Sequence, residues 1–364
     1  MNNIMLYAYT QHNLGDDLFI KILCDRYPNT TFHLLAPRDY DKTFLKLKNL
    51  NIIPRDSLFF RGGNWLATKM NQQQLLSAFL SRECDAVVYA GGSLFIQHAD
   101  WKRQMKQVKA MYIKEKPFFL LGANFGPHSD QAFLMEYHQL FQQFTDICFR
   151  DQYSYTLFND LPNVRVATDM AFQLETTDTK TASMMSVIIS VIKPSIRSSL
   201  RGYDAIYYNK VSEIARYFMI QGYTVTLMSF CGYERDHEAI NSIIHLLSDD
   251  EKNQIRTFYY QYKLEEALTL LSSSAFIVAT RFHSMILGWL FQKPVFPIVY
   301  SSKMTNILND INFQGSYTTF DGLKNLKAEN VYESINTNTV DISNQISKAG
   351  KQFFQLDSYL KTKT

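Results

Sequence analysis

The sequence predicts an α/β protein built from two doubly wound domains, and three observations support this fold class. Short apolar stretches alternate with amphipathic stretches almost from end to end, the apolar stretches are nearly continuous, and one polar segment divides the series in two. Continuous apolar strands joined by helices are typical of parallel sheets covered on both faces. The length of 364 residues also suits two domains better than one.

The first series contains six expected strands with helices between them. The strands are expected at 3–9, 31–37, 85–90, 117–123, 146–150 and 164–168. Helices are expected at 67–83 and 131–143, because apolar residues recur there at helical spacing; in the first of these, Leu75, Leu76, Phe79 and Leu80 share one face.

The second series begins after the threonine-rich segment 175–183, which has no hydrophobic period and is the expected linker. Strands are expected at 185–192, 224–230, 255–260, 275–280 and 295–300, and helices near 203–221, 234–248, 264–274 and 283–292. We therefore expect Rossmann-like domains at 1–178 and 179–336. A final helix at 337–364 follows, with the first domain as its candidate packing partner.

Composition excludes several classes of protein. A formal charge of +3 is too mild for nucleic-acid binding, which leaves a concentrated basic stripe. The four cysteines are far apart and form no CxxC pair, so neither a disulfide framework nor a zinc site is expected. The first residues lack a signal peptide's charged and apolar regions, and no apolar run is long enough to span a membrane. We expect a cytoplasmic protein.

Ligands of doubly wound sheets bind outside the carboxyl ends of the strands, so polar residues there are candidates. After the first strand, NLGDD carries Asn13, Gly15, Asp16 and Asp17, which suit a polyhydroxylated ligand; a turn followed by a helix cap explains them equally well. This loop is no GxGxxG fingerprint, so no nicotinamide cofactor is expected.

Glycine loops follow the third and fourth expected strands. GGSLF presents Gly91, Gly92 and Ser93, whose backbone N–H groups can face a ligand at a helix start, although a structural turn is the alternative. GANFGP offers Asn124 in the same way. Neither loop has the Lys-Ser/Thr pair of a Walker nucleotide site.

Cationic residues stand at further strand ends. Arg150 matches a carboxylate or phosphate bidentately, with a structural pair to Asp151 as the alternative. Arg281, His283 and Lys303 follow two strands of the second series, and together they describe a site for a compact anion with an acid/base at its edge.

Acidic residues also follow strand ends, and Ser284 adds a hydroxyl beside the cationic group. Asp169 follows the last strand of the first series. Glu234, Asp236 and His237 are interpreted as an acid-rich helix start with a stabilising role. Ser284 directly follows the histidine and is a candidate substrate contact.

Seven motifs in order resemble polysaccharide pyruvyl transferases. They are NLGDD, AGGSLF, GANFGP, RDQYSY, TDMAF, RFHSMI and YSSKM, and the resemblance extends from about residue 5 to residue 311. It implies a glycosyltransferase-B-like fold with the active site in the interdomain cleft, and transfer of the pyruvyl group of phosphoenolpyruvate to a sugar as a cyclic ketal. Ala90 replaces a frequent third glycine and His12 a smaller residue, and both bear on the identity of the acceptor.

The resemblance implies that Arg150, His283 and Lys303 are donor-site residues, with Arg281 beside them. The carboxylate and phosphate of phosphoenolpyruvate need several cations to offset their desolvation. Ketal formation begins with protonation of the enol methylene, for which His283 is the natural general acid. Asp16 or Asp17 is expected to orient or deprotonate the acceptor hydroxyl.

The acceptor is expected to be galactose, bridged as a 4,6-ketal, on a lipid-linked precursor of a capsule or exopolysaccharide. The basic segment 101–116 has the charge for peripheral contact with the inner face of the cell membrane, but a solvated helix face is the favoured interpretation. No cofactor and no metal are expected, because the chain has no DxD or HExxH motif and its cations can stabilise the charge.

Two other functions remain open from the sequence. The first is a glycosyltransferase of the same two-domain fold with a nucleotide-sugar donor, since its diphosphate would also need basic residues. The second is a noncatalytic carbohydrate-binding or assembly protein that kept the fold. Donor binding distinguishes the first from pyruvyl transfer, and replacement of His283 distinguishes the second.

Overall fold

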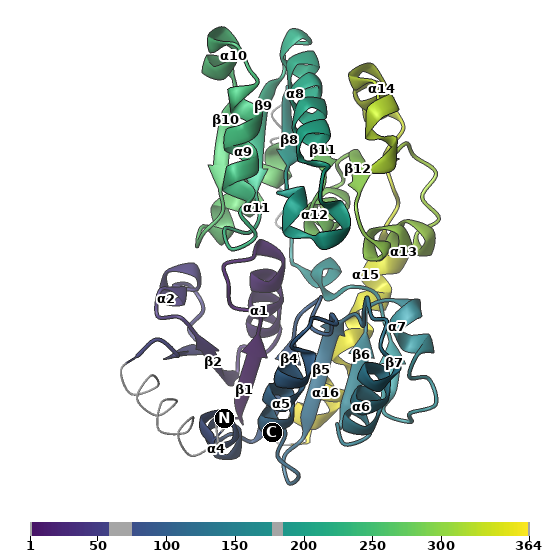
Figure 1. Cartoon of the computed structure of the whole chain (residues 1–364). Coiled ribbons are helices and arrows are strands. Elements are labelled where there is room, and N and C mark those ends of the chain that lie inside the picture. The colour runs from purple at the N-terminus through teal and green to yellow at the C-terminus, as the bar shows by residue number, and fades with distance from the viewer. Residues whose placement is uncertain (1, 58–74, 177–184, 363–364) are drawn as a thin grey trace. The chain divides into compact units, whose positions relative to one another are not determined.

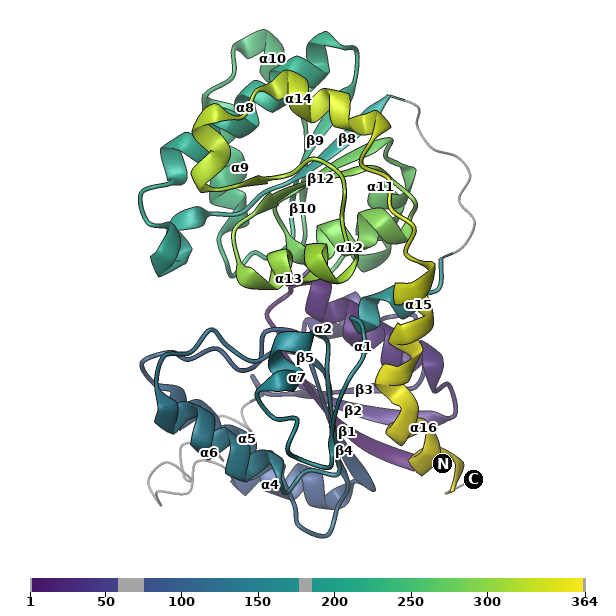
Figure 2. The same cartoon turned by 90° about the vertical axis from the view of Figure 1, so that its right-hand side faces the viewer.

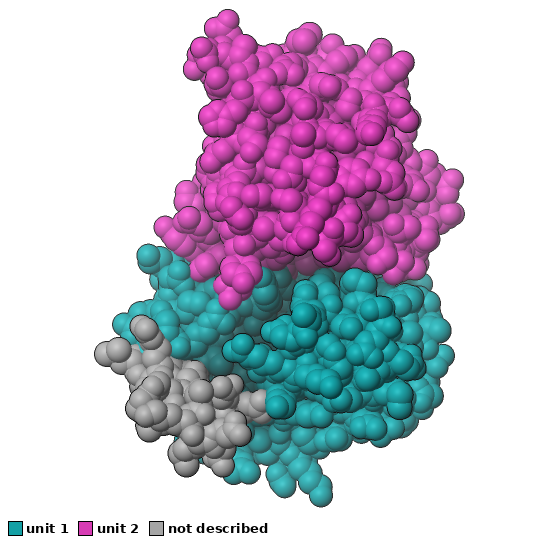
Figure 3. All heavy atoms as spheres, in the orientation of Figure 1, with its two compact units in different colours: residues 1–10, 16–173, 346–364 teal, residues 11–15, 174–345 magenta. Residues whose placement is uncertain are grey.

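The computed structural model describes residues 2–57, 75–176 and 185–362. The chain divides into two compact units, which Figure 3 colours separately. The first contains residues 1–10, 16–173 and 346–364, and the second contains residues 11–15 and 174–345. The expected boundary at 178/179 lies outside the described residues, and the contacts divide the units earlier, at Gln173/Leu174.

The first unit has a seven-stranded sheet among its described residues, in the order β3-β2-β1-β4-β5-β6-β7, with every pairing parallel (Figure 1). The strands are β1 (Asn2–Ala8), β2 (Thr30–Ala36), β3 (Leu50–Pro54), β4 (Ala86–Ala90), β5 (Phe118–Ala123), β6 (Asp146–Phe149) and β7 (Val164–Val166). β3 was not predicted, because this edge strand is only partly buried and ends in proline.

Helices cover both faces of this sheet, as Figure 2 shows. They are α1 (Leu14–Arg26), α2 (Tyr40–Thr43), α4 (Leu75–Glu83), α5 (Trp101–Met111), α6 (Gln131–Phe141), α7 (Gln152–Thr156) and η1 (Met170–Gln173). Met5 and Tyr7 pack in an aromatic core with α5 and α6, while Ile4 and Leu6 are buried on the opposite face. The predicted helix 67–83 is described from Leu75 onward; Leu80 packs on the core, but Phe79 is exposed.

The second unit repeats the design with a six-stranded sheet in the order β10-β9-β8-β11-β12-β13, again all parallel among the described residues. Its strands are β8 (Ser186–Ser190), β9 (Thr224–Ser229), β10 (Arg256–Tyr259), β11 (Phe276–Ala279), β12 (Val295–Val299) and β13 (Thr318–Thr319). Its helices are η2 (Pro194–Ile196), η3 (Ser198–Leu200), α8 (Asp204–Ile220), α9 (Asp236–His245), α10 (Asp249–Gln254), α11 (Leu264–Ser273), α12 (Phe282–Leu290), α13 (Ser302–Asp310), η4 (Asp321–Asn325), α14 (Ala328–Glu333) and η5 (Ser334–Asn336). Two doubly wound parallel sheets confirm the predicted fold class.

The C-terminal segment differs from the single helix predicted at 337–364. It forms α15 (Ser343–Ala349), a 3₁₀ turn η6 (Gly350–Phe353) and α16 (Phe354–Lys361), and residues 346–364 belong to the first unit. Gln352 is fully buried in the turn; it accepts the N–H of Gly122 at 3.0 Å and donates to the carbonyl of Thr168 at 3.0 Å. No described helix is long and apolar enough to cross a membrane.

Candidate active site

Polar residues predicted in the first half gather at the carboxyl ends of the strands of the first unit. The strand order reverses between β1 and β4, where ligands bind in sheets of this kind. Asp16, in the first turn of α1, accepts a hydrogen bond from the Gly92 N–H at 3.5 Å. Ser93 donates to the Asn124 side chain at 3.4 Å, and Gly91 lies beside them in the same loop. The structure therefore brings these predicted residues to one edge.

Arg150 lies against the glycine loop and is ion-paired with Asp169. Its Nη1 is 2.9 Å from an Asp169 carboxylate oxygen, and both side chains are almost completely buried. Its Nη2 donates to Asn124. A Cβ atom at Gly92 would lie 2.5 Å from Nη1, so glycine leaves room there for the guanidinium. The residue expected to hold an anion is thus compensated by a carboxylate, while Asp151 caps α7.

The two acidic candidates for the acceptor differ in burial. Asp17 is fully buried, whereas Asp16 is 9% exposed and contacts the glycine loop. A carboxylate must reach the surface to contact a sugar hydroxyl, so Asp16 is the better placed of the two.

His283 lies in the first turn of α12, and Arg281 is the N-cap of that helix. Gly15 packs directly against the imidazole within the second unit, because a Cβ atom at this position would lie 1.7 Å from Nδ1 of His283. The Asn13 side chain accepts the Gly15 N–H at 3.1 Å, and the Asn13 backbone bridges to Cys231. The structure brings three predicted site residues together here.

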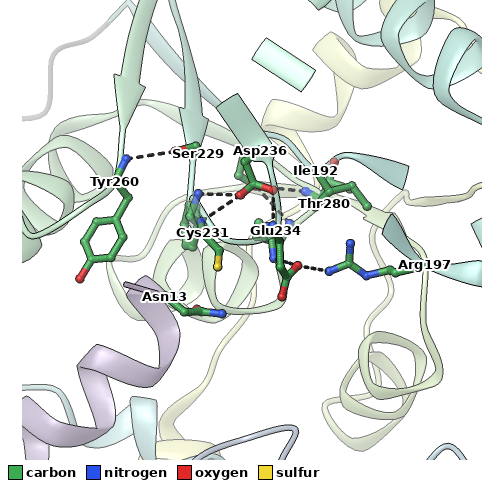
Figure 4. Close-up of polar contacts among 12 residues, drawn as sticks. Asn13, Ile192, Arg197, Ser229, Cys231, Glu234, Asp236, Tyr260 and Thr280 are labelled. Carbon is green, nitrogen blue, oxygen red and sulfur yellow. Dashed lines mark hydrogen bonds and ion pairs between the residues drawn. The ribbon is translucent and has the colours of Figure 1, made fainter. Parts of the chain in front are cut away.

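Arg281 is held by two carboxylates. Its Nη1 is 2.6 Å from a Glu234 oxygen, and its Nη2 pairs with Asp236. Asp236 also accepts the N–H of Phe230 at 2.9 Å and that of Cys231 at 3.0 Å, the second of which can be followed in Figure 4. Asp236 is fully buried and Arg281 nearly so. The acid-rich helix start interpreted as structural therefore contains the partners of a predicted donor residue.

Arg197 joins this cluster from the loop after β8. It pairs with Glu234, as Figure 4 shows, and its Cζ lies 4.7 Å from the centroid of the Tyr300 ring. Lys303, in the first turn of α13, has its Nζ 5.5 Å from the Phe282 ring and 6.0 Å from the Tyr300 ring. Cations from three strand ends thus converge on one edge of the second sheet.

The charges of this cluster shift the pKa of its acidic groups. Burial raises the pKa of Glu234, but Arg281 and Arg197 outweigh burial and lower it to about 2. Burial dominates at Asp236 and raises its pKa despite the pair with Arg281. Burial also raises the pKa of Tyr300, yet Lys303, Arg197 and Arg281 together lower it. The potential around the Tyr300 phenol is therefore positive.

Sequence reasoning missed Arg197, and the structure places the predicted Ser284 in the interior of the second unit. Ser284 is fully buried, and its hydroxyl has no hydrogen-bond partner among the described residues. Arg197 follows a strand, so the rule that found Arg281 applies to it as well. It was missed because it stands seven residues after β8, in a loop without a recognisable motif.

Two doubly wound units with polar residues at the carboxyl ends of their strands define a protein of the glycosyltransferase-B fold class. The family model described as polysaccharide pyruvyl transferase matches residues 13–302, and the chain belongs to this family, as its motifs predicted. Membership makes it a transferase of polysaccharide biosynthesis. No curated protein sequence matches the chain.

Solved structures show the same fold at low sequence identity. Anabaena Alr3699/HepE, solved with UDP and glucose, is 14% identical with a TM-score of 0.59, and the match covers 100% of both chains. UDP-GlcNAc 2-epimerase from Neisseria meningitidis is 12% identical with a TM-score of 0.61, over 99% of this chain and 100% of that one. E. coli ADP-heptose LPS heptosyltransferase II is 15% identical with a TM-score of 0.52, over 92% and 97%.

Proposed function

We propose that this protein transfers the pyruvyl group of phosphoenolpyruvate to a sugar as a cyclic ketal, with His283 as the general acid. One observation carries the proposal. The imidazole lies at the start of α12, packed on Gly15, in the same unit as the cationic cluster of Arg197, Arg281 and Lys303. A proton donor next to an excess of positive charge suits a substrate with three negative charges and a carbon to protonate.

The reaction needs one proton transfer to carbon and two additions of oxygen. His283 donates its proton to the enol methylene carbon, which becomes a methyl group and leaves the adjacent carbon cationic. One sugar hydroxyl adds to that carbon and loses its proton. The second hydroxyl then displaces inorganic phosphate and loses its own proton, which closes the ketal. No redox step occurs, and we propose that no cofactor or metal takes part.

The first unit is proposed to bind the acceptor. Asp16, Ser93 and Asn124 offer a carboxylate, a hydroxyl and an amide at one sheet edge, which are groups that recognise sugar hydroxyls. Asp16 is proposed to orient or deprotonate the attacking hydroxyl. Arg150, which is buried and paired with Asp169, is proposed to hold the glycine loop in place.

Galactose, bridged at its 4- and 6-hydroxyls on a lipid-linked precursor, is the acceptor we propose first. A lipid-linked acceptor would be held at a membrane. The exposed cations of α5, which include Lys102, Lys106 and Lys109, can attract such a membrane electrostatically. The apolar residues Trp101 and Met105 of this helix are buried in the first unit and are not available for insertion.

Mass spectrometry of the acceptor tests the proposal. The purified protein is incubated with phosphoenolpyruvate and lipid-linked saccharides that end in galactose, glucose or N-acetylmannosamine. We expect one acceptor to gain the mass of a single pyruvate ketal while inorganic phosphate is released in equal amount. Hexose transfer from a nucleotide sugar, without use of phosphoenolpyruvate, would contradict the proposal. Equal function in cells of wild type and His283→Ala would instead indicate a noncatalytic role.

A further inference from the structure

Arg281 is already occupied by carboxylates, which raises the question of what binds the phosphate of the donor. Its two terminal nitrogens contact Glu234 and Asp236, and its backbone N–H is fixed on the hydroxyl of Ser190 at 3.2 Å. The two carboxylates already offset the single positive charge of this guanidinium, so Arg281 attracts a further anion only weakly. Other cations of this unit must then supply the charge.

Arg197 offers a donor that points away from its carboxylate partner. Its Nη2 pairs with Glu234, while its Nη1 is buried and has no hydrogen-bond partner among the described residues. Nη1 itself is buried while the side chain as a whole is 22% exposed, so a ligand has to approach this nitrogen from the exposed part of the guanidinium. A buried donor without an acceptor is costly, and a ligand oxygen would satisfy it. The Cζ of Arg197 also lies 4.7 Å from the centroid of the Tyr300 ring, a cation–π contact that stabilises the guanidinium at this position.

Lys303 reaches the surroundings of Tyr300 from a different strand end, that of β12. Its Nζ lies 6.0 Å from the centroid of the same Tyr300 ring and 5.5 Å from Phe282, the neighbour of His283. Arg197 and Lys303 thus share one aromatic ring, and Lys303 also lies near Phe282, which precedes the proposed general acid in the sequence. An arginine fork combined with a lysine point charge is a common way to bind phosphate.

We infer that Arg197 and Lys303, gathered around Tyr300, form the subsite for the phosphate of the donor, and that Arg197 is a substrate-binding residue. The inference rests on the proposed function for the identity of the donor. Inorganic phosphate, the product, shares the chemistry and is expected to bind the same subsite. Arg281 stays bound to its two carboxylates through both terminal nitrogens in this arrangement.

Matched variants test the subsite by titration calorimetry and kinetics. Arg197→Met removes the fork and keeps the length of the chain, and Arg201→Met, at an exposed position four residues on, is the control. We expect Arg197→Met to weaken binding of inorganic phosphate and to raise KM for phosphoenolpyruvate about 10- to 100-fold. Arg201→Met should change neither. Arg197→Lys, which keeps a charge beside Glu234, should show a smaller defect.

The outcomes separate the inference from the proposed function. Unchanged phosphate affinity and unchanged KM in a folded Arg197→Met variant, with wild type active, would overturn the subsite alone. Wild type that binds phosphate through Arg197 but never consumes phosphoenolpyruvate would overturn the proposed function and keep the subsite. Wild type without affinity for phosphate would refute the inference directly. Melting curves of each variant identify any loss of binding that comes from unfolding.

Discussion

Both units carry an arginine–carboxylate cluster at the carboxyl edge of a parallel sheet, but the two clusters differ in charge balance. In the first unit the guanidinium of Arg150 is ion-paired with the carboxylate of Asp169, and both side chains are buried. In the second unit Arg197, Arg281 and Lys303 surround Glu234 and Asp236, so cations exceed carboxylates. We call Arg150 and Asp169 the closed pair, and Arg197, Arg281, Lys303, Glu234 and Asp236 the open cluster. The comparison indicates that the closed pair positions a loop, whereas the open cluster has a net positive charge that can attract an anionic ligand.

Loss of the proposed proton donor should give the largest effect. His283→Ala is expected to lower kcat for phosphate release by about 10²- to 10⁴-fold, the usual contribution of general acid catalysis. The melting temperature should change little, because the imidazole is only partly buried. His237→Ala, at an exposed position, is the control. Retained activity together with a large fall in melting temperature would assign His283 a structural role instead.

The closed pair of the first unit should matter mainly for stability. Asp169→Asn removes the carboxylate charge that lies 2.9 Å from the buried Arg150 Nη1, and it is expected to reduce the free energy of unfolding by about 3–5 kcal/mol. Lys109→Met, which removes an exposed pair with Glu136 in the same unit, should cost less than about 1 kcal/mol. Urea unfolding measures both.

The double variant Arg150→Met/Asp169→Leu provides the decisive comparison for this pair. Removing both charges should recover part of the stability lost by the single variant, since no buried charge remains unpaired. If the single and double variants are equally stable, Asp169 does not compensate Arg150 and the distinction between the two clusters fails.

Gly15 allows a test of how tightly the general acid must be positioned. In Gly15→Ala the new methyl group would overlap Nδ1 of His283, so the imidazole has to move. Displacement of a catalytic group by about 1 Å can cost roughly 10²-fold in rate, and we expect a loss of that order in kcat. Gly232→Ala, whose Cβ would meet nothing within 4 Å, should be neutral. Full activity of Gly15→Ala would show that the contact is not needed.

The sequence predicted the fold well because hydrophobic periodicity reports burial directly. Every strand expected from a continuous apolar run overlaps an observed one, while β3 and β13, one ending in proline and the other two residues long, were missed. The rule that ligands bind at strand ends also singled out His283 and Lys303, which the structure places in the first turns of α12 and α13. Pairing partners were harder to predict, since Asp169 and Glu234 stand 19 and 47 residues from Arg150 and Arg281. Only three-dimensional contacts show which cations remain available.

Replacement of Glu234 is expected to give the smallest effect, and the pH dependence of the unfolding free energy tests the open cluster. Its cationic partners lower its pKa from 4.5 to about 2, so its ionised form stabilises the fold above pH 4.5. That contribution should disappear as the pH falls from about 4.5 to about 2. The raised pKa of Asp236 acts in the opposite direction, because acid relieves the cost of burying its charge.

Glu234→Gln should cost on the order of 2 kcal/mol of unfolding free energy at pH 7, with a difference from wild type that vanishes toward pH 2. Glu238→Gln, whose pairs with Lys193 and Arg235 are screened by solvent, should show a much smaller difference. A difference between wild type and Glu234→Gln that is constant from pH 7 to pH 2 would mean that the cations of the second unit do not act on Glu234, and that they are less concentrated at this edge than the contacts indicate.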